Sequence, residues 1–151
     1  MHVRTFLFVP LLALAACSAR EDHEDDDDFD FDATDWSTQL SARASSGVTG
    51  AATARSVGIS GGAGTSTATV EIRGAAPGAR HPWHVHTGTC ATGGPIVGEA
   101  NDYDVLEAGA DGTDEETAAV SAGMDENARY HVNVHRSPSD LTVISCGDLV
   151  D

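Results

Sequence analysis

The sequence has no lysine and few aromatic residues. Its eight basic side chains are all arginines, and against 24 aspartates and glutamates they leave a formal net charge of −16 over 151 residues. Nucleic acids and anionic membranes both attract basic side chains. The composition therefore excludes nucleic acid as a partner and argues against electrostatic adhesion to a membrane. The length suits one domain. Because only 5% of the residues are aromatic, its core must consist mainly of small and β-branched side chains.

The sequence also lacks an apolar run long enough to span a bilayer, which takes about 20 residues. Its longest run is the 12 residues 5–16 (TFLFVPLLALAA), which follow a short segment with one arginine, as in a signal peptide. The LAAC segment at residues 14–17 resembles a bacterial lipobox, in which cleavage precedes a cysteine that carries lipid. We predict a lipoprotein signal peptide over residues 1–16, lipid on Cys17 as the membrane anchor, and location in the bacterial cell envelope. The alternative is an ordinary secretory signal.

An acidic segment follows the predicted signal. Ten of the fifteen residues from 21 to 35 are aspartate or glutamate. Such a segment repels itself and cannot bury enough apolar surface to fold. We therefore predict a disordered tether over residues 17–36 and a folded domain over residues 37–151.

Cysteine is also scarce, with Cys17, Cys90 and Cys146 only. If Cys17 carries lipid, the other two remain as an even pair in a compartment where disulfides persist. A Cys90–Cys146 disulfide is the first interpretation, and two unpaired thiols are the alternative.

No helical period is evident from Ser37 onward, whereas several short segments alternate as strands do. In Thr65–Arg73, apolar and small side chains share one face and polar ones the other. Glycine-rich turns flank this segment. Similar runs occupy residues 38–44, 48–59, 81–86, 103–107, 116–121, 129–135 and 141–146. Eight short strands separated by turn residues indicate an all-β sandwich or barrel.

Two of these segments carry five of the seven histidines: HPWHVH at residues 81–86 and YHVNVH at residues 130–135. In a strand, His84 and His86 share a face about 7 Å apart, so that both rings can reach one ion. His131 and His135 are about 13 Å apart, so only one of them can readily complete that site. Three imidazoles without a carboxylate favour copper or zinc. The alternative is a set of exposed surface histidines.

The HPWHVH segment, Cys90, the later Val134-His135 pair and the final Cys146-Gly147 pair together resemble the copper/zinc superoxide dismutase family. The resemblance covers about 115 residues from Ser37 onward. It implies an eight-stranded Greek-key β-barrel whose metal site lies on the outside of the barrel wall. It further implies that one copper ion is held by His84, His86 and His135, that His81 braces the copper site, and that Cys90 and Cys146 form the disulfide that anchors the loop beside the metal.

The chain departs from that family in two features: the histidines that bind the second metal ion, zinc, and the arginine that guides the anionic substrate. Between Thr87 and Tyr130 it has no histidine, so the bridging and zinc-binding histidines are missing and a zinc site is not expected. The family's anion-guiding arginine stands three residues before the final cysteine, where this chain has Val143. Arg80 and Arg136 are the arginines nearest the histidine motifs. A chain of strongly negative charge without that arginine attracts superoxide weakly.

The YHVNVH segment also resembles the Y-V-N-V-H strand of CHRD domains, a bacterial β-module. Three functions therefore stay open. The first is a copper-only superoxide dismutase, and the second is a copper-binding protein without turnover. The third is a CHRD-like structural or interaction module that binds no physiological metal.

Overall fold

The computed structural model describes residues 33–59 and 63–151. The predicted signal peptide, Cys17 and most of the predicted tether lie outside these ranges. The described chain is all β apart from one 3-10 turn at Ala100–Asp102, which confirms the predicted fold class. Its strands are β1 (Ala33–Ala42), β2 (Thr49–Ile59), β3 (Ala63–Arg73), β4 (Arg80–His81), β5 (Trp83–Thr87), β6 (Leu106–Glu107), β7 (Asp114–Val120), β8 (Tyr130–Ser137) and β9 (Asp140–Leu149). Within these same ranges, no helix has the length and apolar character that crossing a membrane would require.

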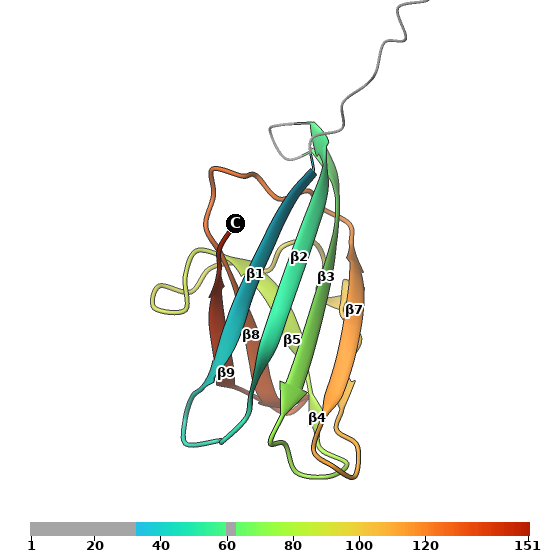
Figure 1. Cartoon of the computed structure of the whole chain (residues 1–151), viewed down its shortest axis with the longest axis vertical. Coiled ribbons are helices and arrows are strands. Elements are labelled where there is room, and N and C mark those ends of the chain that lie inside the picture. The colour runs from blue at the N-terminus through green and yellow to red at the C-terminus, as the bar shows by residue number, and fades with distance from the viewer. Residues whose placement is uncertain (1–32, 60–62) are drawn as a thin grey trace, which may run out of the picture.

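Seven of the strands form one antiparallel sheet in the order β5-β8-β9-β1-β2-β3-β7. The sheet curls so that β1, β2, β3 and β7 lie in front of β9, β8 and β5 (Figure 1). The curl passes through β1, whose residues 33–40 pair with β2 and whose residues 41–42 pair with β9. The result is a curled half-barrel whose two halves face each other as the layers of a sandwich do.

The described residues form nine strands instead of the predicted eight because one predicted strand is divided, and another is shortened. Pro82 divides the segment 81–86 into β4 and β5, since proline has no N–H to donate to a sheet ladder. The segment 103–107 shrinks to the two-residue β6, which pairs with β4 in a separate two-stranded sheet.

The first strand begins earlier than expected. Residues 33–36, which the acidic composition assigned to the tether, belong to β1. Trp36 is buried and its ring packs edge-to-face on that of Tyr130, with centroids 5.8 Å apart. Asp35 stands opposite Arg55 in the β1–β2 register, and their side chains form an ion pair of 2.8 Å. The acidic segment therefore ends inside β1. Burial of the Trp36 indole and the ion pair with Arg55 offset the cost of placing Asp35 in that strand.

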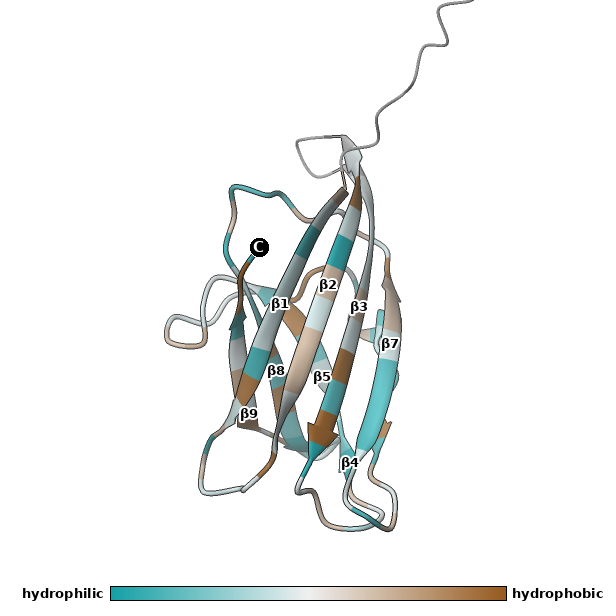
Figure 2. Ribbon diagram, in the orientation of Figure 1, coloured by the Kyte–Doolittle hydropathy of each residue, from teal (hydrophilic) through white to brown (hydrophobic). Residues whose placement is uncertain are grey.

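The core lies between the two layers and follows the alternation of each strand. Apolar and polar residues alternate along the strands in Figure 2. The front layer contributes many small side chains, and the back layer contributes larger ones. The buried apolar residues include Ala52, Ala54, Ala68, Val70, Ile72, Ala118 and Val120 in front and Trp83, Val85, Val132, Val134 and Ile144 behind. The small side chains of the front layer leave room for the Trp83 indole of the back layer, so the core packs closely although it contains few aromatic residues.

Candidate metal centre

Strands β5 and β8 lie side by side and direct their histidines to the same side of the sheet. On β5, Trp83 and Val85 point into the core, and His84 and His86 point away from it. The register places Trp83 opposite Val134 on β8 and His86 opposite His131. The alternation predicted for both segments is therefore present, and it places the imidazoles on the outer face of the back layer.

These histidines are not the exposed residues of the alternative interpretation. His135 is 7% exposed and His131 is 0% exposed. The segment after β5, residues 88–97, turns back along that strand and covers His131. Val97 N–H donates to the Val85 carbonyl at 2.9 Å, and the backbone of Gly88 lies against His131. The sequence predicted the face on which these rings lie, but not that a loop buries it.

A disulfide fixes this covering loop. The structure joins Cys90 to Cys146 on β9, with their Cα atoms 6.0 Å apart. The Cys90 N–H also donates to a carboxylate oxygen of Asp148, at 2.6 Å. The loop is thus attached to β9 by a covalent bond and by a charge-assisted hydrogen bond.

Three histidines meet beneath this loop. His84, His86 and His135 each offer one ring nitrogen, and these three atoms lie within 4.8 Å of one another. The ring centroids are 5.8 Å apart for His84 and His86, and 5.5 Å apart for His84 and His135. As the spacing argument predicted, only one of the two histidines on β8 joins the pair on β5.

Backbone carbonyls orient two of these rings. The Nδ1 of His86 lies 2.9 Å from the Gly94 carbonyl oxygen, and the Nδ1 of His135 lies 2.8 Å from that of Leu141. A carbonyl only accepts, so each Nδ1 must carry the proton and donate it. The Nε2 of each ring then keeps a free lone pair, which is the arrangement found in metal-binding histidines.

Two of the three rings carry a buried nitrogen that has no protein partner. The Nε2 of His86 and the Nδ1 of His84 are both buried and make no hydrogen bond. A buried nitrogen without a partner costs about 1–3 kcal/mol, and a metal ion bound to its lone pair would remove that cost. The donor set, three imidazole nitrogens converging on one point, therefore fits a metal such as copper or zinc.

Tyr103 packs against the third ring, His84, which has no orienting carbonyl. The two rings meet edge-to-face with centroids 5.3 Å apart. Tyr103 is held in turn by a 2.8 Å hydrogen bond from its hydroxyl to the Val97 carbonyl and by an edge-to-face contact with Trp83. The sequence placed Tyr103 only in a predicted strand and gave no signal of this contact, which joins a loop residue to a strand.

His81 supports the backbone of β8 next to the three histidines. It is buried, and its Nδ1 is 2.9 Å from the carbonyl oxygen of His135. The imidazole therefore holds the chain of β8 at the residue whose side chain is one of the three candidate ligands.

Burial favours the neutral form of two of the three rings, those of His84 and His135. The pKa of His84 falls to about 4, first because the ring is desolvated and then because His135 and His86 lie close to it. Burial also lowers the pKa of His135. Neutral imidazole is the form that binds metal, so near neutral pH the site needs no proton release from His84.

The lowered pKa of His84 predicts a pH dependence for the metal-free protein. The unfolded chain protonates this histidine near its ordinary pKa of 6.5, whereas the folded chain resists protonation down to about 4. The contribution to stability is therefore complete above pH 6.5 and is lost as the pH falls towards 4. Thermal unfolding of the metal-free protein at pH steps from 7.5 to 4 should show a falling midpoint in this window. The decline should be smaller in His84→Gln, and equal declines in the two proteins would contradict the assignment.

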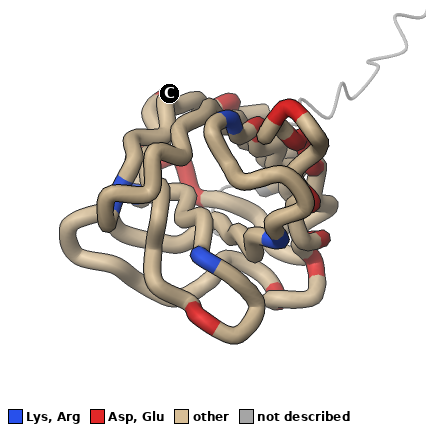
Figure 3. The backbone as a smooth tube through the Cα atoms, turned by 90° about the horizontal axis from the view of Figure 1, so that it is seen from below, with Lys and Arg blue, Asp and Glu red and all other residues tan. Residues whose placement is uncertain are grey.

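Two of the arginines near the histidine motifs are paired with acidic side chains. Arg80 contacts Glu107 at 2.9 Å, and Arg136 contacts Asp140 at 3.4 Å. In the view of Figure 3 the basic positions are scattered, and acidic positions gather mainly on the right side. Val143, at the position of the expected anion guide, stands opposite His135 in the β8–β9 register. Neither arginine is thus a free positive charge for an incoming anion.

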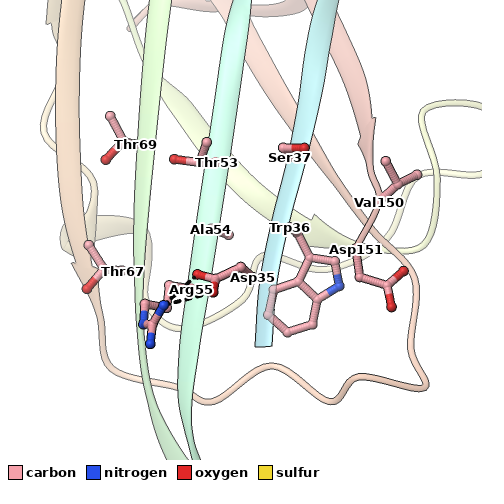
Figure 4. Close-up of a pocket in the computed structure, with 10 residues that line it drawn as sticks. All are labelled: Asp35, Trp36, Ser37, Thr53, Ala54, Arg55, Thr67, Thr69, Val150 and Asp151. Carbon is pink, nitrogen blue, oxygen red and sulfur yellow. Dashed lines mark hydrogen bonds and ion pairs between the residues drawn. The ribbon is translucent and has the colours of Figure 1, made fainter. Parts of the chain in front are cut away.

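One groove among the described residues lies away from the three histidines. It has a volume of about 570 Å³ and runs over β1, β2 and β3 beside the last residues of the chain (Figure 4). Its lining includes the Asp35–Arg55 ion pair and several threonines, and none of the three site histidines belongs to it. The groove is therefore separate from the three histidines and adds nothing to the interpretation of their function.

Comparisons with known proteins leave the site to be interpreted from its own geometry. No protein-family model matches the chain, and a search of curated proteins finds no significant match. What the described chain establishes is an all-β domain that carries a disulfide and three histidines able to hold one metal ion.

Proposed function

We propose that this protein binds one copper ion through His84, His86 and His135. The observation that carries the proposal is the convergence of three ring nitrogens within 4.8 Å, and the buried, unpartnered nitrogens of His84 and His86 support it. Three imidazoles form a suitable donor set for copper, and for such a site copper binds more tightly than the other divalent first-row metals. The resemblance to copper/zinc superoxide dismutases favours the same ion and the same ligands, and the missing bridging and zinc-binding histidines argue against a second, zinc-bound site.

The protein's own residues hold and orient the ligands. The Gly94 and Leu141 carbonyls fix two rings, and Tyr103 packs on the third. Bound copper would supply one-electron chemistry through its Cu(II) and Cu(I) states. His84 and His86 are only half-buried, which leaves a side from which a small molecule can approach.

Rapid dismutation of superoxide is the less favoured form of this proposal. Superoxide is an anion, and an acidic surface with Arg80 and Arg136 already paired provides little electrostatic attraction. We therefore place copper binding first and superoxide turnover second. A barrel of the Greek-key dismutase type, lipid on Cys17 and location in the bacterial cell envelope complete the proposal.

Metal loading tests the site. The chain from Ser18 onward should be loaded with copper and zinc, dialysed and assayed for metal content. We expect one tightly held copper ion per chain, and its loss in His84→Ala and in His135→Ala because each removes one of three ligands. His23→Ala is the matched control, since it removes a histidine of the acidic segment and should leave the copper content unchanged.

Superoxide consumption by the loaded protein then separates the remaining functions. A rate above that of copper-free protein indicates a copper-only dismutase, and tight copper without such a rate indicates a copper-binding protein. Absence of tightly bound copper would refute the proposal and favour the CHRD-like module. Mass spectrometry of the native membrane fraction tests the anchor, and an unlipidated mature N-terminus would refute it.

A further inference from the structure

His131 lies directly beside the candidate copper site without belonging to it. Its ring stacks on that of His86, with an interplanar angle of 22° and centroids 5.2 Å apart. The two residues are register partners on β5 and β8, so the pairing of the strands itself sets this contact. Because His131 is fully buried, the contact lies within the packed structure.

The other side of His131 is also enclosed. Asp148 is its register partner on β9, and this carboxylate holds the Cys90 N–H of the covering loop. His86, His131 and Asp148 therefore form a row across three neighbouring strands beneath the loop that the disulfide anchors. The imidazole in the middle of this row is held between β9, the loop and the His86 ring.

Hydrogen bonds hold the His131 ring only weakly. Its Nδ1 is buried and has no hydrogen bond of good geometry, although the backbone of Gly88 lies against the ring, and its Nε2 has one long contact, 3.4 Å, to the amide nitrogen of Asn133. The flat face of the ring is therefore its main interaction with the site, and that face lies on His86.

His86 needs such a contact because its single hydrogen bond leaves one motion free. The bond from Nδ1 to the Gly94 carbonyl fixes the position of one ring atom, but the ring can still tilt about that atom. A plane stacked on the ring limits the tilt. We propose that His131 is a positioning residue, whose stacked ring fixes the plane of His86 and thereby the direction of its Nε2 towards the metal. This inference rests on the proposed copper function.

Two apolar replacements of His131 distinguish the effect of its flat ring from the effects of its nitrogens and its volume. His131→Phe keeps a flat ring in the buried space, whereas His131→Leu fills that space with a side chain that cannot stack. Both variants keep all three copper ligands and should bind one copper ion. We expect His131→Leu to bind Cu(II) about 10-fold or more weakly, since loss of a residue that orients a ligand typically costs 10- to 100-fold in metal affinity. His131→Phe should stay close to the wild type.

The measurements are Cu(II) affinity by chelator competition and the electron paramagnetic resonance spectrum of the Cu(II)-loaded chain from Ser18 onward. The spectrum of His131→Leu should differ from that of the wild type, and that of His131→Phe should match it. Val132→Ala is the matched control for general loosening, because it empties part of the core on the opposite face of the same strand. It should lower the melting temperature and leave the Cu(II) spectrum unchanged.

Each outcome decides the inference. Wild-type affinity and spectrum in His131→Leu would overturn it. So would equal damage in His131→Phe, which would assign the role to the nitrogens, or an equal spectral change in Val132→Ala, which would assign it to general packing. If the wild type itself holds no tight copper, the proposed function fails, a result that the unsubstituted protein alone reveals.

Discussion

Replacing both Cys90 and Cys146 with serine is expected to lower the free energy of unfolding by about 4 kcal/mol on the chain-entropy model. The disulfide joins residues 56 positions apart in the sequence, so without it the unfolded chain gains a large amount of conformational freedom. For a small domain, whose whole stability is about 5–15 kcal/mol, this is a large share.

Loss of the disulfide should also weaken metal binding. The disulfide anchors the loop whose Gly94 carbonyl orients His86, so the double variant should bind copper more weakly as well as unfold more easily. Urea unfolding of the metal-free protein and chelator competition for Cu(II) measure the two effects. Val150→Ser, a replacement of a side chain that is 61% exposed, serves as the control and should change neither. Unfolding midpoints that coincide for the double variant and the wild type would show that the bond contributes nothing to stability.

Trp83→Ala is expected to have the second large effect, a destabilisation of about 3–5 kcal/mol, which is typical for removal of a buried aromatic side chain. The indole is 1% exposed, and its N–H donates to the Asp104 carbonyl at 2.9 Å. It also supports Tyr103, which in turn packs on His84. The substitution therefore opens a cavity, leaves a carbonyl without its donor and removes the support of a ligand ring.

Trp36→Ala is the matched control for this prediction. Trp36 is also buried, but its aromatic contact is with Tyr130 and not with Tyr103. Both variants should unfold at lower urea concentration, and only Trp83→Ala should also weaken Cu(II) binding. Trp83→Phe should recover part of the stability because it keeps a ring in the core. Equal copper affinities in the two alanine variants would refute the link from Trp83 to the site.

The part of the site that follows strand periodicity could be predicted from the sequence. Alternation in HPWHVH and YHVNVH is enough to place His84, His86 and His135 on one face, because side chains in a strand alternate strictly between two faces. The distance argument anticipated that only one of His131 and His135 would join, and the choice of His135 came from the resemblance to the dismutase family.

The remaining features depend on contacts between segments distant in sequence. Burial of His131 requires the loop after β5 to fold back under the disulfide, and the contact of Tyr103 with His84 requires a loop to meet a strand. Neither of these features produces a periodic pattern in the sequence from which it could be predicted. The break at Pro82 followed from a local rule, the missing N–H, that the apolar pattern around it concealed. The early start of β1 depended on Arg55, a partner that lies one strand away from Asp35.

The strand order has a consequence for the time at which the site can form. β9 lies between β8 and β1, so until residues 140–149 pair, β5–β8 and β1–β2–β3–β7 share no ladder. Joining them requires Ser41 to meet Cys146 across most of the domain, and contacts so distant in sequence form slowly. The same strand carries the Leu141 carbonyl that orients His135 and the cysteine that anchors the covering loop. If the protein binds copper as proposed, the complete site forms only after the last strand has entered the sheet, and a bound ion would report that event.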